Sequence, residues 1–343
     1  MGAARPRTMA VVPSRIPLGW GGFLAGALLA GCRPGLQAPP ATAAPAAALQ
    51  PVAMGIDWYP ESEFGGFYQA MARGFYRDAG LAVTLNPGGP NTHSNVDLVK
   101  GSVQFVSAAS DDVIEREEQG VPLLIVGTFM ERYPEVILVR AESPVRSLRD
   151  LDGRTVIADP GAGWVTNVER RYGIKVNISP GDYEVTRFIA DPTVIQQVYL
   201  TNEPYYIRKQ GIKVRTLDLA DEDYNPYRVI VTTKSYAHDH PGTVRKFVAA
   251  SMRGWNDFIF RDASPGRDLI LALNAETTRE FVDASIATLR SEHIIDGSPG
   301  RGEAIGALSL DRLQRQINRL AEIGYIKAPF PVAEVATTEF LPR

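Results

Sequence analysis

Residues 54–81 read MGIDWYPESEFGGFYQAMARGFYRDAGL, and this stretch decides the fold. It continues a strand that is indicated by apolar residues at alternate positions: Val52, Met54 and Ile56. The strand pattern ends at Tyr59-Pro60, where a polar and aromatic loop begins. An amphipathic helix follows, with large apolar residues four apart: Phe67, Met71 and Phe75. Gly80 supplies the stop, so the stretch predicts a strand, a loop and one helix.

The loop between this strand and helix is the first place where we expect a ligand. In open α/β sheets, ligands bind where the carboxyl ends of the strands meet the free amides of a helix N-terminus. The candidate contacts are Asp57, Trp58, Tyr59, Glu63 and Phe64. A carboxylate flanked by Trp58 and Tyr59 suits a planar ring that is aminated or cationic. The Asp57 carboxylate could instead hold the backbone amides of its own loop.

The same motifs resemble a known family. The order is D-W-Y-P at 57–60, then G-F-Y-Q-A at 66–70 and G-F-Y-R-D-A-G-L at 74–81, with Thr201-Asn202-Glu203-Pro204 as a second matching point. This pattern resembles the periplasmic substrate-binding proteins of ABC importers, in the branch shared with thiamine-pyrimidine synthases and pyrimidine-precursor binders. Sulfonate, taurine and nitrate binders are more distant. The resemblance extends to about Gly254.

The resemblance implies an α/β fold of the two-lobed periplasmic-binding-protein type (type II). Each lobe would be a mostly parallel sheet flanked by helices, with two crossover strands as the hinge. The predicted division is lobe 1 at 51–140 plus 234–343 and lobe 2 at 141–233. A folded part of about 290 residues fits two lobes better than one core.

Residues 1–32 predict an export signal. Three arginines precede an apolar run at 16–31 that is shorter than the roughly 20 residues needed to span a membrane. The run ends in Leu29-Ala-Gly-Cys32, which resembles a lipoprotein cleavage site and predicts acylation of Cys32. A plain secretory signal with a chance cysteine is the alternative. Because Cys32 is the only cysteine, the chain has no disulfide, thiolate metal site or cysteine nucleophile.

Residues 33–50 are rich in Pro and Ala and predict an extended tether. The formal net charge is −3, and removing the three signal arginines makes it −6. This acidic balance gives no support for nucleic-acid binding. We therefore expect a lipid-anchored protein at the periplasmic face of a bacterial membrane.

Further strand–helix junctions add candidate ligand contacts. A strand at 155–158 leads through DPGAG into a helix, so the amides near Gly163 could meet a polar ligand. Trp164 is either a stacking wall or an ordinary lobe contact. Asn202 and Glu203 face the ligand by resemblance, although Asn202 could simply cap the next helix. Asn91, in the turn NPGGPN, and Ser110 and Asp111, at a helix start, complete the set; that serine could also be only a cap.

The sequence contains few catalytic patterns. The segment GAGWVT lacks the third glycine of a dinucleotide fingerprint, and no HExxH, P-loop or nucleophile elbow is present. His238 and His240 form a pair without a nearby third ligand, which favours a solvent-facing loop over a metal site. We expect no cofactor, no metal and no enzymatic activity. The alternative is an enzyme similar to the pyrimidine synthases that consume pyridoxal phosphate.

The predicted function is capture of a small aromatic or heterocyclic solute for an ABC permease and ATPase, by a monomer. A thiamine-precursor pyrimidine is the first choice, followed by riboflavin-like compounds, sulfonates and aromatic acids. Asp57 and Glu63 favour a neutral or amine-bearing ligand over an anion. Arg73, Arg132 and Arg187 would reverse that preference if they lined the cleft. A sensing role in place of transport stays open.

Overall fold

A computed structural model describes residues 48–90, 92, 94–181, 183–220, 224–297 and 305–342. The chain divides into two units, 1–46 and 47–343, and all the described residues belong to the second. The predicted signal with Cys32, most of the tether, and Asn91 lie outside the described residues. Among the described helices, none is both long and apolar enough to span a membrane.

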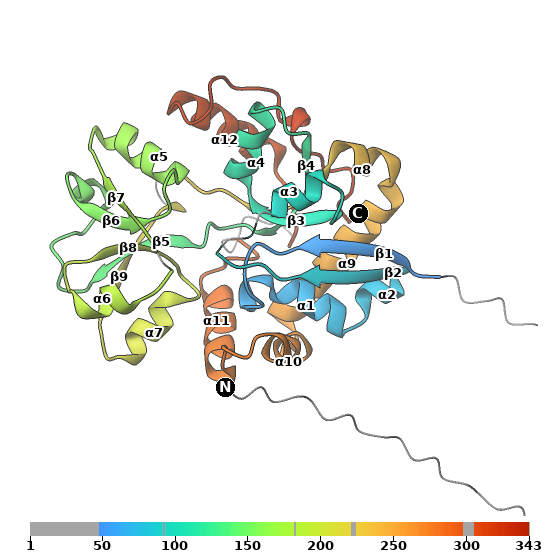
Figure 1. The fold of residues 1–343 in the computed structure, drawn as a ribbon, viewed down its shortest axis with the longest axis horizontal. Helices are drawn as coiled ribbons and strands as arrows, with labels where there is room; N and C mark the ends of the chain where they lie inside the picture. The colour runs from blue at the N-terminus through green and yellow to red at the C-terminus, as the bar shows by residue number, and fades with distance from the viewer. Residues whose placement is uncertain are drawn as a thin grey trace, which may run out of the picture. The chain divides into compact units, whose positions relative to one another are not determined.

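The first sheet has five strands in the order β2-β1-β3-β10-β4 (Figure 1). Their bounds are β1 Gln50–Gly55, β2 Leu81–Asn86, β3 Phe105–Ala109, β4 Leu123–Met130 and β10 Arg228–Thr233. β1 is parallel to β2 and β3, whereas β10 is antiparallel to both β3 and β4. β4 is almost wholly buried, as its uninterrupted apolar run predicts.

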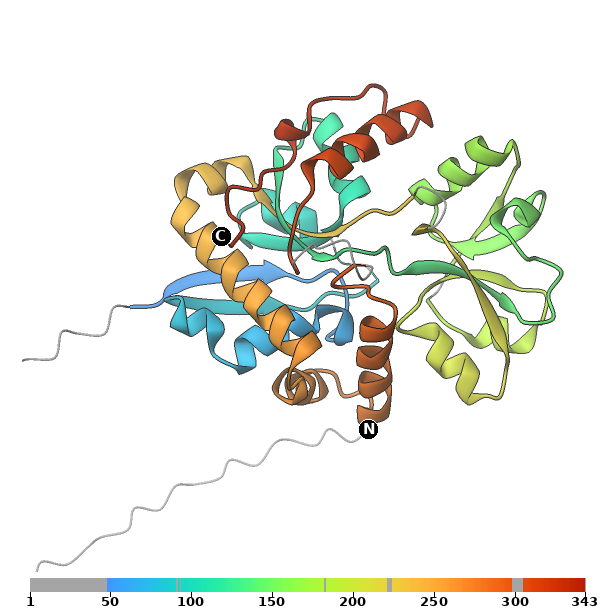
Figure 2. The same cartoon turned by 180° about the vertical axis from the view of Figure 1, so that it is seen from behind.

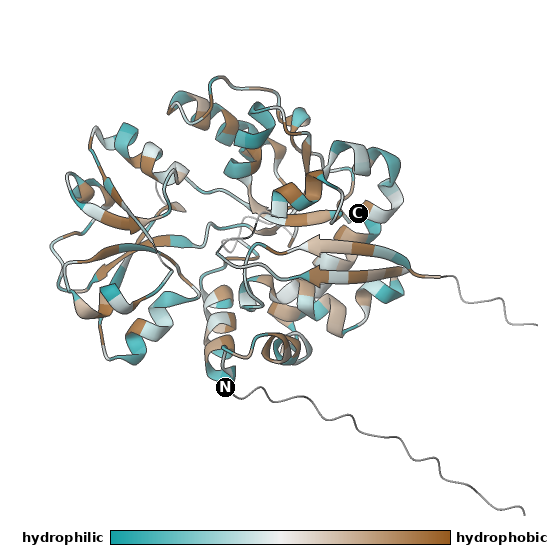
Figure 3. Ribbon diagram, viewed as in Figure 1, coloured by the Kyte–Doolittle hydropathy of each residue, from teal (hydrophilic) through white to brown (hydrophobic). Residues whose placement is uncertain are grey.

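Helices cover both faces of the first sheet (Figure 2). One face carries α1 Gly65–Ala72, α2 Phe75–Asp78, α8 Lys234–Asp239, α9 Pro241–Phe260, α10 Ser264–Leu273 and α11 Arg279–Ser291, which share one apolar core. The other carries α3 Ser94–Val99, α4 Ser110–Glu118 and α12 Leu310–Glu322. Short 3-10 turns occur at Ser62–Phe64 and Val332–Glu334. Figure 3 shows hydrophobic residues concentrated along the strands and on the helix faces beside them.

The opening helix differs from its prediction because it is divided into α1 and α2. Gly74 adopts a left-handed conformation, with φ +76°, and ends α1 before the apolar spacing does. α1 lies unusually close to α9: a Cβ added to Gly66 would lie 2.0 Å from the ring of Trp255. Trp255 is completely buried. This packing fixes the loop that leads from β1 into α1.

The second sheet repeats the arrangement of the first, in the order β7-β6-β8-β5-β9. Its strands are β5 Glu135–Arg140, β6 Thr155–Ala158, β7 Asn177–Pro180, β8 Ile195–Tyr199 and β9 Val214–Asp218. Its helices are α5 Gly163–Tyr172, α6 Thr186–Ala190 and α7 Glu203–Lys209, with a 3-10 turn at Leu148–Leu151. β6 is parallel to β7 and β8, and β5 is antiparallel to β8 and β9. β1 with its neighbours β2 and β3 in the first sheet therefore corresponds to β6 with its neighbours β7 and β8 in the second.

These two sheets with their helices form two lobes, as the sequence predicts. The chain crosses from β4 to β5 and returns from β9 to β10 (Figure 1). The predicted lobe boundaries after residues 140 and 233 need correction, because β5 pairs within the second sheet and β10 within the first. Both strands are short apolar runs, which fit either buried sheet equally well.

Arg312 of α12 holds the two crossover segments together. Its Nη2 donates to the carbonyl oxygens of Glu131 and Asn225, each at 2.7 Å. Its guanidinium lies 3.6 Å from the ring centre of Tyr227. Glu131 belongs to the first crossover and the other two residues to the second. The hinge is therefore fixed by a residue far along the chain.

Candidate functional site

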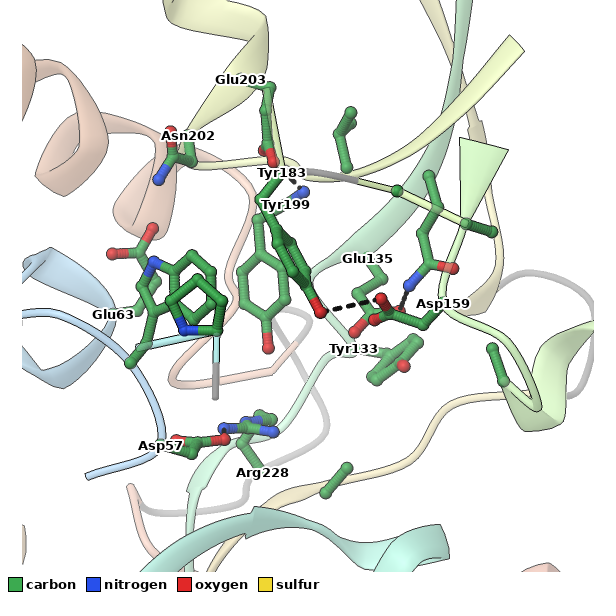
Figure 4. A pocket seen from close by; sticks show the side chains of 18 of the residues that line it. Asp57, Glu63, Tyr133, Glu135, Asp159, Tyr183, Tyr199, Asn202, Glu203 and Arg228 are labelled. Carbon is green, nitrogen blue, oxygen red and sulfur yellow. Dashed lines mark hydrogen bonds and ion pairs between the residues drawn. The ribbon is translucent and has the colours of Figure 1, made fainter. Parts of the chain in front are cut away.

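A cavity of about 410 Å³ lies between the two lobes (Figure 4). The first lobe contributes Asp57, Trp58, Glu61, Glu63, Phe64, Asp111, Asp112 and Arg228. The second contributes Glu135, Asp159, Gly163, Tyr183, Gln196, Gln197, Tyr199, Asn202 and Glu203, and Tyr133 of the first crossover lies between them. A volume of this size lies near the lower end of small-molecule sites, which span about 300–1,000 Å³.

Three adjacent strands of the first sheet build an ionic network at the cavity wall. Asp57 follows β1, Ser107 lies in β3, and Arg228 is the first residue of β10. Ser107 Oγ donates to the Asp57 carboxylate and accepts from the Asp57 backbone amide at 3.1 Å. Arg228 Nη2 forms an ion pair with the other oxygen of Asp57 (Figure 4). Asp57 thus bonds to Ser107 and Arg228 rather than to its own loop, contrary to one of the two predicted alternatives.

Arg228 stays charged despite being only 6% exposed. Burial acts to lower its pKa, but the charge of Asp57 and its hydrogen bond to Arg228 outweigh that effect, and the pKa is raised above the usual value. Among the described residues that line the cavity, it carries the one positive charge.

Carboxyl groups dominate the cavity. Eight of them line it: Asp57, Glu61, Glu63, Asp111, Asp112, Glu135, Asp159 and Glu203. Burial is the largest cause that raises the pKa of six of these groups: to about 9 for Glu61, about 8 for Glu135 and about 7 for Asp112 and Glu203, and in the same direction for Glu63 and Asp111. Several of them therefore hold protons near neutral pH and can donate hydrogen bonds.

Hydrogen bonds between carboxyls of the first lobe and polar groups of the second join the lobes. Asn202 Nδ2 donates to Glu61 Oε2 at 2.7 Å, and Thr201 Oγ1 donates to Glu63. The Asn202 side chain does not cap α7, so the predicted capping alternative is wrong. Glu203 Oε2 accepts from the backbone amide of Tyr199 at 2.9 Å. Direct contacts between the lobes therefore close the cavity where Glu61 and Glu63 meet Thr201 and Asn202.

An aromatic pair spans the cavity from one lobe to the other. The rings of Trp58 and Tyr183 have centroids 5.0 Å apart and are inclined at 58°. Tyr183 Oη donates to Asp159 Oδ1 at 3.0 Å (Figure 4). Tyr59 packs edge-on against Trp58 but is 46% exposed and does not line the cavity. Trp58 and Tyr183 therefore give the cavity aromatic surface from both lobes, in addition to Phe64, Tyr133 and Tyr199.

Four buried polar atoms of the lining have no hydrogen-bond partner among the described residues: Glu63 Oε2, Asp111 Oδ1, Gln196 Oε1 and Arg228 Nε. A buried polar atom without a partner costs about 1–3 kcal/mol. The residues that carry these atoms line the cavity and include both hydrogen-bond donors and acceptors.

The structure brings most of the predicted site residues together. Those that line the cavity are Asp57, Trp58, Glu63, Phe64, Asp111, Gly163, Asn202 and Glu203. Ser110 is turned away, with its Oγ donating to Gln316 at 2.8 Å and accepting from the Tyr227 amide at 3.0 Å. It is not the residue that precedes α4, so the predicted cap is wrong as well.

Trp164 is core and not a stacking wall. It is completely buried, and its Nε1 donates to Gln197 Oε1 at 2.8 Å. The three arginines considered from the sequence do not line the cavity. Arg73 pairs with Asp257 at 2.9 Å, Arg132 pairs with Asp218 and Glu292, and Arg187 is exposed.

The sequence did not predict most of the lining residues of the second lobe or the arginine of the lining, Arg228. The missed residues are Glu61, Asp112, Tyr133, Glu135, Asp159, Tyr183, Gln196, Gln197, Tyr199 and Arg228. A charged residue at the start of the apolar strand 228–233 was a usable signal for Arg228. Tyr183 had no such signal, because it follows the unpredicted strand β7.

The described residues contain no group of three His, Cys, Asp or Glu side chains placed to hold a metal ion. His238 and His240 are both exposed at the end of α8.

Comparison with known proteins places the chain in a family. Residues 61–262 match the family model described as NMT1/THI5 like. The chain is 26% identical over 331 residues to the riboflavin-binding protein RibY of Chloroflexus aurantiacus, covering 88% of this chain and 90% of that protein. It is 23% identical over 235 residues to a formylaminopyrimidine-binding protein of Halalkalibacterium halodurans, covering 62% and 68%.

Among solved structures, the fold is similar to that of the alkanesulfonate-binding protein SsuA of Xanthomonas axonopodis, bound to MOPS. The TM-score is 0.62 at 15% identity, covering 85% of this chain and 99% of that chain. At this identity the likeness shows the fold alone, which is the expected periplasmic-binding-protein fold. Because the family model matches more than half of the sequence, the chain belongs to the NMT1/THI5 like family.

Proposed function

We propose that this protein is the solute-binding component of an ABC-type importer and captures a flat nitrogen heterocycle that is neutral or amine-bearing. The observation that carries the proposal is the lining of the cavity: among the described residues it has eight carboxyls and one arginine, which Asp57 already neutralises. A bare anion such as a sulfonate or nitrate would find no free cation there and would be repelled by the carboxyls that are ionised. A neutral heterocycle needs no cation and can accept hydrogen bonds from the carboxyls that hold protons.

The polar groups of the cavity favour a pyrimidine-type ring. Riboflavin and formylaminopyrimidine, the ligands in the names of the two relatives, both contain one, and its edge alternates hydrogen-bond donors and acceptors. The lining residues Glu63, Asp111, Gln196 and Arg228 carry both donors and acceptors. Riboflavin is the first compound to test, since the match to RibY spans more of the chain. The thiamine-precursor pyrimidine expected from the sequence is the second.

The aromatic pair supports a planar ligand. Trp58 and Tyr183 come from different lobes, so a ring inserted against them contacts both lobes at once. We infer that the lobes open to admit the solute and close over it, with Asn202 bonding to Glu61 in the closed form. The closed form would then be presented to a permease and its ATPase.

The rest of the assignment completes this proposal. The protein would work as a monomer at the periplasmic face of a bacterial membrane, held there through lipidated Cys32. It would bind its solute without converting it. Fold alone does not separate a binder from an enzyme, and the proposal rests on the cavity chemistry and on the names of the relatives.

A thermal-shift panel on the purified chain tests the proposed function. The compounds are riboflavin, a formylaminopyrimidine, an alkanesulfonate and nitrate. A ligand present at 100 times its dissociation constant adds about 2.7 kcal/mol of stability. We expect a shift with at least one of the two heterocycles and none with the anions. A shift with the anions alone would overturn the proposal.

A further inference from the structure

We infer that Asp57 sets the class of ligand, because it occupies the cavity's arginine and so excludes anions. The inference rests on the proposed function in that the cavity must be the binding site. It makes a separate prediction, however: neutralising Asp57 should convert the cavity into one that accepts a small anion at Arg228.

The position of Arg228 makes it the natural anchor for an anion. It lies at the sheet edge where β1, β3 and β10 meet, and its side chain is 8% exposed. Its Nε has no partner among the described residues, and it lines the cavity. A guanidinium presents its donors as a planar fork that suits the oxygens of carboxylates, sulfonates or nitrate. In the native chain a protein carboxylate already takes one arm of that fork.

Hydrogen bonds hold Asp57 in its position beside Arg228. Its backbone amide and its carboxylate both bond to Ser107, which lies on the neighbouring strand β3. The carboxylate therefore cannot swing away from Arg228 without losing a second hydrogen bond. The Asp57 side chain is more exposed than that of Arg228, at 32% against 8%, so it forms the ligand-facing end of the pair.

Replacing this aspartate leaves the buried Arg228 cation without its direct ion-pair partner, and the acidic groups that remain near it are Glu135, Asp111 and Asp112. Removing one partner of a buried ion pair is unfavourable because the remaining charge is uncompensated. An anion that enters the cavity would pair with Arg228 at the position that the Asp57 carboxylate occupies in the wild type. Asp57→Asn is the sharpest change, since an asparagine keeps the shape and can still bond to Ser107.

The experiment is a calorimetric titration of nitrate and of methanesulfonate into the wild type and Asp57→Asn. We expect no measurable anion binding by the wild type and a gain of at least about tenfold in affinity for the variant, the usual scale of one charge-assisted hydrogen bond. No gain in a folded Asp57→Asn chain would overturn the inference.

Two matched variants separate this effect from a general change in charge. Asp159→Asn removes the same charge from the cavity but leaves Arg228 paired, and it should gain no anion binding. Asp57→Asn combined with Arg228→Gln should lose whatever the single variant gains. Equal gains in Asp159→Asn, or a gain that persists in the double variant, would contradict a role for the Asp57–Arg228 pair.

If Asp57→Asn does not fold in anion-free buffer, its refolding provides the readout. Refolding of this variant in methanesulfonate but not in the neutral dimethyl sulfone supports the inference. If neither compound allows refolding, the experiment is repeated with the smaller Asp57→Ser. Failure of both variants with both compounds overturns the inference. Heterocycle binding by the wild type tests the proposed function alone, so the two ideas can fail separately.

Discussion

Trp58 and Trp164 occupy corresponding places in the two lobes yet have different roles. Trp58 lies in the loop that follows β1, and Trp164 is the second residue of α5, the helix that follows β6; β1 and β6 hold the same position in two sheets of similar strand arrangement. Trp58 is partly exposed, lines the cavity and packs against Tyr183 of the other lobe. Trp164 is completely buried and donates to Gln197.

The difference comes from what each loop is attached to. The loop after β1 continues through a polar segment with Glu61 and Glu63 before α1 begins, so Trp58 projects between the lobes. The turn after β6 is short, and Trp164 is the second residue of α5, which packs against the core. An indole beside a strand end thus acts as a ligand wall only where the following chain leaves it uncovered.

The largest expected effect concerns Trp164. Trp164→Ala should lower the free energy of unfolding by about 3–5 kcal/mol, because a large buried ring leaves a cavity. Trp164→Phe, which keeps a ring but loses the bond to Gln197, should cost clearly less. Chemical denaturation of each variant measures this. A loss below about 1 kcal/mol for Trp164→Ala would show that this indole is not part of the core.

Trp58 should give the opposite result. Trp58→Ala should weaken binding of the heterocycle roughly ten- to hundredfold, since stacking of a base on an aromatic ring contributes about 1–3 kcal/mol. Its stability should change by less than about 1 kcal/mol. Tyr59→Ala is the matched control, because that ring lies outside the cavity, and it should have a much smaller effect on affinity in the same titration. Equal losses in the two variants would contradict the assignment of Trp58.

The acidic loop beside Trp58 should make stability depend on pH. Burial, with the nearby Glu63 and Glu203, raises the pKa of Glu61 from its usual 4.5 to about 9 in the folded chain. The folded state therefore binds more protons than the unfolded state between these values, and stability falls as pH rises from about 5 to 9.

Each proton contributes a slope of up to about 1.4 kcal/mol per pH unit. Glu61→Gln should flatten the dependence, whereas Glu142→Gln, an exposed control outside the cavity, should leave it unchanged. Denaturation at a series of pH values measures both slopes. A wild-type stability that rises steadily over this range would contradict the buried, protonated state of these carboxyls.

The smallest effect is expected at the partner of Trp58. Tyr183→Phe removes only the exposed hydrogen bond to Asp159 and should change stability by no more than about 0.5 kcal/mol. Because the ring remains, affinity for the heterocycle should change less than twofold, while Tyr183→Ala should weaken it several-fold. Calorimetry on both variants tells whether the ring or the hydroxyl matters.

The strand and helix alternation could be predicted where a run of apolar residues marks the element. β6 has the expected bounds, because Val156, Ile157 and Ala158 form such a run. β7 is equally short but reads NISP, without an apolar run, and α6 has only five residues, so both were missed. The break at Gly74 was missed because apolar spacing continues across it, and only its positive φ separates the two helices.

The site was predictable only where one rule applied, namely that ligands gather at strand–loop–helix junctions. That rule found Asp57, Trp58 and Glu63. It could not find Arg228, which begins an antiparallel strand, or Tyr183, which depends on a long-range approach of the two lobes. Nor could it separate Trp164 from Trp58, since a tryptophan near a strand end does not by itself show what will cover its ring.

Equilibrium dialysis tests the central claim most directly. The chain is dialysed against an equimolar mixture of riboflavin, a formylaminopyrimidine, an alkanesulfonate and nitrate, and the bound fraction is analysed by mass spectrometry and ion chromatography. We predict that one heterocycle is enriched, at one molecule per chain, and is recovered unchanged. Enrichment of the sulfonate or nitrate without either heterocycle, or recovery of a converted compound, would contradict the account.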